Sequence, residues 1–342
     1  MNFLPKLWNS IKKISLALAF IILIIAGGWA ANHYDKSKKP PVADKQLIVE
    51  GDNALNNGYY SDAKRIFADE LHAHPKNKEA AWGLQVSQLR ETFMQVGFKE
   101  ALDSAYQQHP DDPHINLFLG EFYAASNDVD QALKYYTRAI AQSPKLAEAH
   151  YDMARLYDQQ GNAEEAIVEA LKAIDIAPIP KYRNNLGAIY FKQQHYEQAI
   201  KEFGRNKEYP LSALESAKIY WRLEYLSQAV SYQKQAIEWL EDKRIMAKLE
   251  NQELWYFETS KSSGVLLPLL GDKKSYAYYS LSVSLFLQGD YEGAAEAQQK
   301  LAEFKVSKPI DIRTLMVAEL DALVAANTSF AEPVAAYKKL YL

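Results

Sequence analysis

Residues 119–144, LGEFYAASNDVDQALKYYTRAIAQSP, decide the fold because their pattern returns twice along the chain. The marked positions of this stretch are Leu119, Gly120, Tyr123, Ala132, Tyr136, Ala139 and Pro144. The same order follows about 34 residues later at Met153, Ala154, Tyr157, Ala166, Ala170, Ala173 and Pro178. It comes again about 33 residues further on at Leu186, Gly187, Tyr190, Ala199, Phe203 and Pro210. Self-similarity at this period indicates a stack of equivalent structural units.

The residue types in the pattern suit a pair of packed helices. Small residues such as Ala132 and Ala139 let two helices approach closely where they cross. A tyrosine such as Tyr123 fills the layer between units while its hydroxyl reaches a polar rim. Pro144 cannot continue a helix and therefore ends it. Each unit is thus predicted to be a helical hairpin.

This pattern resembles the tetratricopeptide repeat family, sharply over residues 113–210 and in weaker form from about residue 44 to residue 305. The resemblance implies an all-α fold, an α-solenoid that winds as a right-handed superhelix of about seven helical hairpins. One weaker copy, residues 78–111, has Phe98 where the pattern expects a small alanine.

The chain is predicted to divide into several segments. Repeats occupy residues 47–241, an irregular helix and loop occupy residues 242–274, and a repeat-like unit with a C-terminal helical cap occupies residues 275–342. Residues 242–262 read as one helix, which Gly264, Pro268 and Gly271 follow as breakers. Residues 327–329 separate two helical patterns in the cap, which is expected to cover the exposed apolar end of the solenoid.

The N-terminus reads as a membrane signal. Residues 14–31 carry no charge over 18 residues, and a helix of that length is about 27 Å long, close to the thickness of a bilayer core. We expect residues 1–13 in the cytoplasm, a transmembrane signal-anchor at residues 14–31 and a linker at residues 32–46, so that a single-pass inner membrane protein carries a periplasmic repeat domain. The alternative is export after signal-peptide cleavage near Ala30.

The composition and the motifs argue against an enzyme active site and against a metal site. The chain has no cysteine, so thiolate catalysis and thiolate metal sites are excluded. Its net charge of −4 lacks the positive excess that is typical of proteins that bind nucleic acid. No nucleophile elbow, phosphate-binding loop or metalloprotease motif is present. Three acids share a helical phase and are interpreted as a solvated face: Glu121, Glu148 and Asp158. The histidine pairs are interpreted as loop residues: His72, His74, His109 and His114. We predict no enzyme activity, no metal and no cofactor.

The resemblance implies that the first helices of successive repeats line a concave groove, which grips a peptide or a helix of a partner protein. Carried over by phase, the lining residues are Leu117, Glu121, Tyr151, Arg155, Asp158, Asn184, Ala188, Phe191, Lys218, Trp221 and Arg222. Trp221 and Arg222 are the favoured contact pair, because Trp and Arg dominate interface hot spots. Packing of Trp221 against residues 242–262 is the alternative. The Lys and Asn clamp that some members use for a C-terminal carboxylate is not reproduced, because its positions hold Tyr151, Arg155, Asn184 and Ala188.

Together these features predict a non-enzymatic, membrane-anchored scaffold for protein–protein interaction in the assembly of a bacterial cell-envelope complex, such as secretion, pilus or polysaccharide machinery. One alternative is an organelle-surface receptor with a cytosolic repeat domain, and another is a glycan-binding or enzyme-associated subunit. Partner identity and oligomeric state stay open. Most of the 23 tyrosines fall on packing positions, whereas four lie partly outside them and are candidate partner contacts: Tyr151, Tyr276, Tyr278 and Tyr279.

Overall fold

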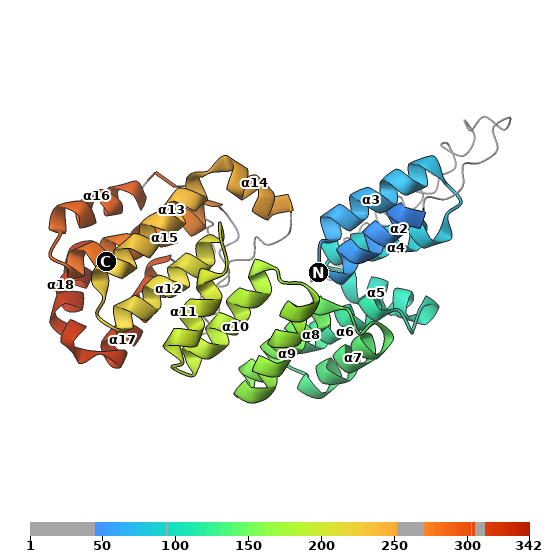
Figure 1. The fold of residues 1–342 in the computed structure, drawn as a ribbon, viewed down its shortest axis with the longest axis horizontal. Coiled ribbons are helices and arrows are strands. Elements are labelled where there is room, and N and C mark those ends of the chain that lie inside the picture. Colours follow the sequence, from blue (N-terminus) through green and yellow to red (C-terminus); the bar gives the residue numbers. More distant parts are fainter. Residues whose placement is uncertain (1–44, 94, 252–269, 302, 305–311) are drawn as a thin grey trace, which may run out of the picture.

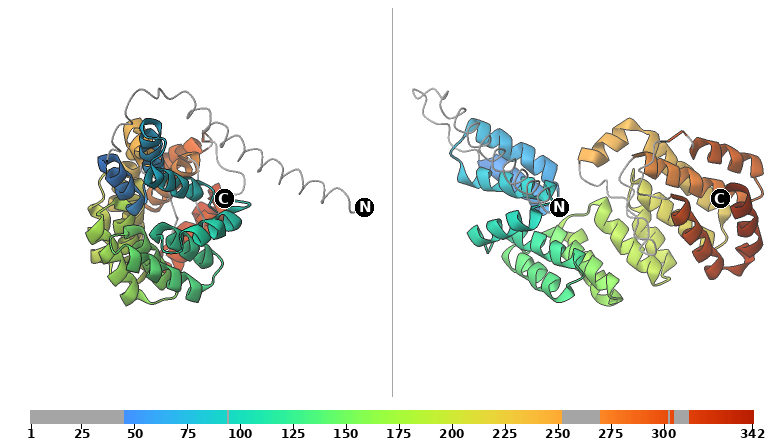
Figure 2. Two further views of the ribbon diagram at one scale, coloured as in Figure 1. Left: turned by 90° about the vertical axis from the view of Figure 1, so that its right-hand side faces the viewer. Right: turned by 180° about the vertical axis from the view of Figure 1, so that it is seen from behind.

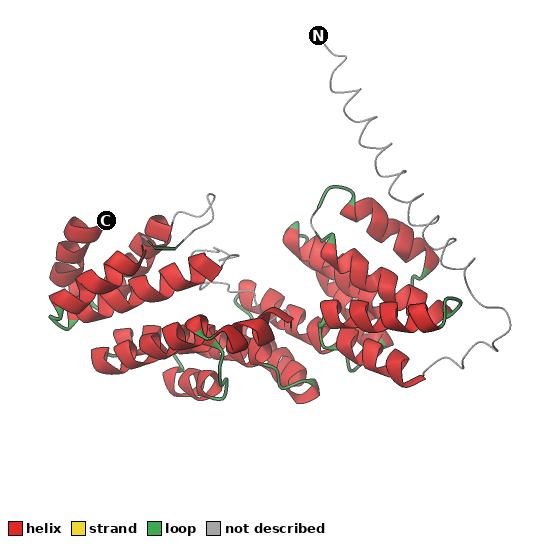
Figure 3. Ribbon diagram, turned by 90° about the horizontal axis from the view of Figure 1, so that it is seen from above, coloured by secondary structure: helices red, strands yellow, loops and turns green. Residues whose placement is uncertain are grey.

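The computed structural model describes residues 45–342 except residues 94, 252–269, 302 and 305–311. In this part of the chain every regular element is helical, and the helices follow one another in sequence order from α2 at one end to α18 at the other (Figure 1). Figure 3 colours the elements by type and shows helices joined by loops in the part of the chain that the structure describes. The prediction of an all-α helical solenoid is therefore confirmed.

Most helices pair as antiparallel neighbours, which is the expected hairpin. The pairs with their bounds are α2 (Lys45–Asn56) with α3 (Tyr60–Ala73), α6 (Pro113–Ala125) with α7 (Val129–Gln142), α8 (Ala147–Gln159) with α9 (Ala163–Ile176), α10 (Pro180–Lys192) with α11 (Tyr196–Gly204), α12 (Pro210–Arg222) with α13 (Leu226–Glu241), and α15 (Leu270–Leu287) with α16 (Tyr291–Leu301).

The hairpin of α6 and α7 shows how the repeated residues build the unit. Asp112 caps α6 by accepting hydrogen bonds from the backbone N–H groups of His114 and Ile115. A Cβ added at Gly120 would lie only 2.4 Å from the ring of Tyr136, so the glycine makes room for the aromatic side chain of the second helix. Ala132 is fully buried at the crossing. Gly187 and Phe203 repeat this contact between α10 and α11, also at 2.4 Å.

The unit that carries Phe98 departs from the hairpin pattern. Helix α4 (Lys78–Glu91) packs mainly against α3, whereas α5 (Phe98–Gln108) packs against α6. Phe98 is 2% exposed, and its ring centroid lies 5.1 Å from that of Phe93 and 6.4 Å from that of Phe122. A large ring at the position where alanine lets two helices touch keeps α4 and α5 apart.

The irregular segment begins with a short helix, α14 (Lys243–Asn251). The rest of the helix predicted for residues 242–262 lies outside the described residues. Helix α15 starts at Leu270, so it extends into the segment that was predicted to be a loop.

The last hairpin turns into the groove. It consists of α17 (Ile312–Ala326), the short 3₁₀ helix Thr328–Phe330 and α18 (Ala331–Tyr341), with the break where the sequence predicts it. Helix α17 contacts the first helices α12 and α15, and it lies next to α12 in Figure 1 and in the rear view of Figure 2. Met316, Leu320 and Leu323 of α17 are buried in one apolar cluster with Leu214 and Ala217 of α12.

The prediction of an inner membrane protein with a periplasmic repeat domain is wrong. Within the described ranges no helix combines the length and the apolar character needed to cross a membrane. The expected anchor, residues 14–31, lies outside the described residues.

Candidate functional site

The predicted groove residues fall into two environments along the first helices, one largely covered and one half-buried. Asp158 is 4% exposed and belongs to the covered set. Leu117, Glu121, Lys218 and Trp221 are largely covered by other parts of the chain. Another set is half-buried: Tyr151, Arg155, Asn184, Ala188, Phe191 and Arg222. These six residues on α8, α10 and α12 are called the central groove below.

The N-terminal helices cover the groove beside α6. The guanidinium of Arg90 in α4 forms an ion pair with Glu121, and it lies 5.1 Å from the ring centroid of Tyr60 and 5.6 Å from that of Phe118. Tyr60 is 2% exposed. At Gly58, in the turn before α3, an added Cβ would lie 2.8 Å from a carboxylate oxygen of Glu148. Leu117 and Glu121 therefore face the chain's own first helices.

A buried ionic cluster joins α6, α8 and α10 at this place. One carboxylate oxygen each of Glu121, Glu148 and Asp152 lies within 4.8 Å of the other two. The Nζ of Lys181 lies 2.5 Å from Glu148, and the hydroxyl of Tyr182 donates to Glu148 at 2.8 Å. Arg155 lies 3.6 Å from Asp152. Carboxylate oxygens suit hard cations, but here an arginine or a lysine already stands beside each acid.

The two central acids titrate in opposite directions. Burial raises the pKa of Asp152 well above its ordinary value, and the negative charges of Glu121 and Glu148 raise it further. Burial also opposes the ionisation of Glu148, but the charges of Lys181 and Arg90 and two hydrogen bonds outweigh it and lower the pKa of Glu148. Asp152 thus tends to hold a proton while Glu148 stays ionised.

The last hairpin covers the groove over α12 and α15. Lys218 lies 3.0 Å from both Glu215 and Glu319, and the hydroxyl of Tyr276 donates to Glu319 at 2.8 Å. Burial opposes the charge of Lys218, but the two carboxylates raise its pKa well above the ordinary value. Glu319 belongs to α17, so Lys218 binds a helix of its own chain.

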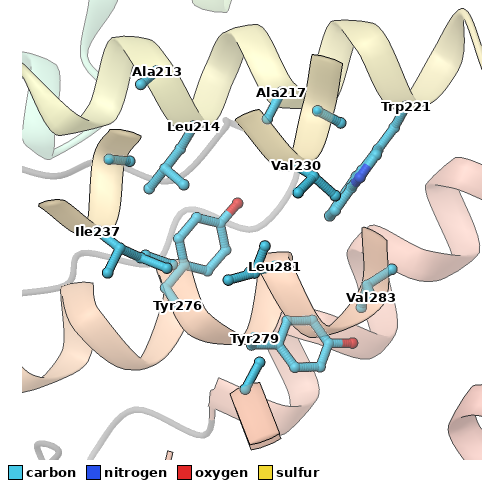
Figure 4. Packing of buried hydrophobic residues seen from close by; sticks show 14 of the residues in the cluster. Ala213, Leu214, Ala217, Trp221, Val230, Ile237, Tyr276, Tyr279, Leu281 and Val283 are labelled. Carbon is cyan, nitrogen blue, oxygen red and sulfur yellow. The ribbon is translucent and has the colours of Figure 1, made fainter. Parts of the chain in front are cut away.

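Trp221 is part of this covered region. It is 4% exposed, and its indole Nε1 donates to the hydroxyl of Ser284 in α15. Figure 4 shows it pointing from α12 toward Val230 and the helix that carries Tyr279 and Val283. Trp221 packs on α15, which the sequence did not indicate as its neighbour. Tyr276 and Tyr279, two of the tyrosines that the repeat left unexplained, are also buried beneath α17 and α18.

In the central groove, cationic side chains lie on aromatic rings. The Nζ of Lys181 is 4.5 Å from the ring centroid of Tyr151, and the guanidinium of Arg222 is 4.6 Å from that of Phe191. On α10, the amide oxygen of Asn185 is buried, and it has no hydrogen-bond partner among the described residues.

The sequence alone could not indicate that the chain would cover both ends of its groove. The one signal at the N-terminal end was Phe98 in place of alanine. The basic residue Lys181 follows the Pro180 that opens α10, and its helical phase already makes it a groove candidate in the sequence.

The paired helices define a helical-repeat protein, and comparison with known proteins agrees with this architecture. Models of the tetratricopeptide repeat match residues 99–147, 124–184 and 213–242. Tetratricopeptide repeats are therefore supported within residues 99–184 and 213–242, as the sequence pattern predicts.

Relatives match over one part of the chain. Hsp70-Hsp90 organizing protein 1 of Glycine max is 32% identical over 74 residues, which are 21% of this chain and 13% of that protein. The Protein SGT1 homolog of Oryza sativa subsp. japonica is 35% identical over 74 residues, 21% of this chain and 20% of that protein. The chain therefore spans no more than a fifth of the length of these relatives.

A solved structure matches over almost the whole chain. The crystal structure of the APC/C hetero-tetramer Cut9-Hcn1 covers 94% of this chain and 59% of its own, with a TM-score of 0.53 and 14% identity. At that identity the likeness concerns the fold alone.

Proposed function

We propose that this chain is a non-enzymatic interaction scaffold that holds a segment of a partner protein in its central groove during the assembly of a multi-protein complex. The observation that carries the proposal is the division of the groove into covered ends and a half-exposed middle. Beside α6 and beneath α17 the chain supplies its own occupants. The stretch between them presents Tyr151, Phe191 and Arg222.

The chemistry of this stretch supports a peptide ligand. Aromatic rings and an arginine are the residue types that carry most binding energy at protein interfaces. Two relatives carry the name Hsp70-Hsp90 organizing protein, which supports a role in bringing other proteins together.

A steric block tests the proposal. Ala188 has the smallest side chain in the central groove, so Ala188→Trp fills it without removing a charge. Crosslinked complexes of the tagged full chain, isolated from cells that produce it, are expected to lose their partner in this variant.

The matched control is Val168→Trp, at a residue that is 50% exposed on α9 outside the central groove. It adds the same side chain and should keep the partner. Retention of the same partner by Ala188→Trp, with the helical circular dichroism of both variants unchanged, would contradict the proposal.

A further inference from the structure

We infer that the exposed side of α18 is an interface between two copies of this chain, which associate with their α18 helices packed antiparallel. This surface lies outside the central groove, so the inference goes beyond the proposed function and does not depend on it. The occupant is a second copy, related to the first by a twofold axis that passes between Ala335 and Ala336.

Helix α18 lies at the outer edge of the stack, at the end opposite α2 (Figure 1). Its inner side packs on α15, α17 and the short 3₁₀ helix, and Val334 and Tyr337 are buried there. Its other side forms one exposed stripe, because side chains four residues apart lie above one another on a helix. The residues of this stripe, called the outer face of α18 below, are Ala331, Glu332, Ala335, Ala336, Lys339 and Leu340.

The outer face of α18 is apolar for the end of a solenoid. A terminal unit normally presents polar side chains to water, because no further unit covers it. Helix α2, at the other end of the described stack, follows this rule. Its exposed residues are Lys45, Gln46, Val49, Glu50, Asp52 and Asn53. On α18, by contrast, four of the six exposed residues are alanine or leucine, so this end has the composition of a surface that packs against protein.

Large apolar side chains mark the same region. Leu340 is 66% exposed, and Tyr291 at the start of α16 is 61% exposed. The ring of Phe286 links the two helices, since its centroid lies 5.0 Å from that of Tyr291 and 6.2 Å from that of Tyr341. The exposed apolar surface therefore continues from α18 onto α16.

The two charges of the outer face lack a partner in their own helix. Ion pairs on a helix form between residues three or four positions apart. Between Glu332 and Lys339 these positions hold Ala335 and Ala336 for both charges. The adjacent Lys338 pairs with Asp321 of α17 at 2.5 Å, whereas neither Glu332 nor Lys339 forms an ion pair among the described residues. Both charges are thus available to a second molecule.

The outer face is complementary to itself when a second copy runs in the opposite direction. About the twofold axis, Glu332 of each copy lies opposite Lys339 of the other, so the same ion pair forms twice. Ala335 and Ala336 lie at the crossing, where small side chains let the helix axes approach to about 8 Å. A parallel arrangement would place like charges together, so the charges select the antiparallel one.

The size of the contact sets its strength. Leu340 of each copy packs on Ala331 of the other at the two ends of the crossing. A single pair of 11-residue helices buries little surface, and small interfaces give reversible complexes. We therefore expect a dimer that forms and dissociates in the micromolar range.

Sedimentation equilibrium of the full chain at increasing concentration tests the inference. The mean mass should rise from that of one chain toward that of two. Glu332→Lys alone and Lys339→Glu alone should each weaken the dimer about tenfold or more, because each change places like charges opposite each other twice. An equal mixture of the two variants should associate again, since one then presents two lysines at these positions and the other two glutamates.

The matched control is Lys234→Glu on the exposed face of α13, which should dimerise like the parent chain. Helical circular dichroism should be the same for all variants, because each changed residue is exposed. A parent chain that stays monomeric at about 100 μM, well above the micromolar range, would overturn the inference. A dimer that survives both single reversals, or a mixture of the two variants that does not associate, would overturn it as well.

Discussion

The Nζ of Lys218 in α12 lies 3.0 Å from a carboxylate oxygen of Glu319 in α17 and 3.0 Å from one of Glu215 in its own helix. This contact fixes the last hairpin inside the groove, because the lysine compensates two buried acids that come from different parts of the chain. The C-terminal hairpin therefore acts as an internal ligand of the first helices.

Removal of that lysine should destabilise the C-terminal end. Lys218→Met leaves Glu215 and Glu319 without a cation, and breaking a buried pair of this kind costs about 3–5 kcal/mol. Urea unfolding should report the loss, and limited proteolysis should cut near α17. Lys234→Met on the exposed face of α13 is the control, and an equal stability of the two variants would contradict the assigned role of Lys218.

The N-terminal helices should depend on Arg90 in the same way. Arg90→Met leaves Glu121 buried without its partner, with an expected loss of about 3–5 kcal/mol. The double change Arg90→Met with Glu121→Leu should cost less than the sum of the two single changes, because the second change removes the uncompensated charge. Chemical unfolding of the parent, the two single variants and the double variant gives the coupling energy. If the losses of stability of the single variants add up to that of the double variant, the pair does not link α4 and α6.

The repeat geometry makes a prediction about glycines. Gly120→Ala places a methyl group 2.4 Å from the ring of Tyr136, so we expect a loss of stability of about 1–3 kcal/mol from overpacking. Gly204→Ala is the matched change, since no atom lies within 4 Å of the added Cβ at that helical position. Thermal unfolding should separate the two variants, and similar melting temperatures would contradict the close contact of α6 and α7.

Asp152 should make stability depend on pH. Its pKa is raised from the ordinary value of 3.8, so the folded chain holds a proton that the unfolded chain releases. The free energy of unfolding therefore falls as pH rises from about 4 toward the folded pKa. Asp152→Asn lacks this penalty, so its stability relative to the parent should increase from pH 4 to pH 7 in urea unfolding.

Asp175→Asn, at an exposed position of α9, controls for the general effect of losing a carboxylate. If the difference in the free energy of unfolding between Asp152→Asn and the parent stays constant across this pH range, the proton is not held at Asp152 in the folded chain.

Sequence reasoning predicts the local unit well and the long-range contacts poorly. The Gly120–Tyr136 contact and the buried alanines follow from a period of about 34 residues, because each repeat packs on its neighbour in the same way. The break at residues 327–329 follows from local composition.

The covered ends of the groove could not be predicted, since they depend on contacts far apart in the sequence. Trp221 has the residue type of an interface hot spot, yet it is buried against α15 through Ser284, 63 residues later. Glu121 has a groove phase, but Arg90 reaches it because the hairpin of α4 and α5 is open. Such contacts arise from how the superhelix turns, which the repeat pattern does not specify.

A photo-crosslinking amino acid at Phe191 tests the central claim most directly. In cells that produce the full chain, p-benzoylphenylalanine at Phe191 should form a covalent adduct with one partner, and Ala188→Trp should abolish that adduct. The same probe at Val168 on α9 should not form it. An adduct that forms equally from Val168, or one that persists with Trp at position 188, would contradict the central groove as the binding site.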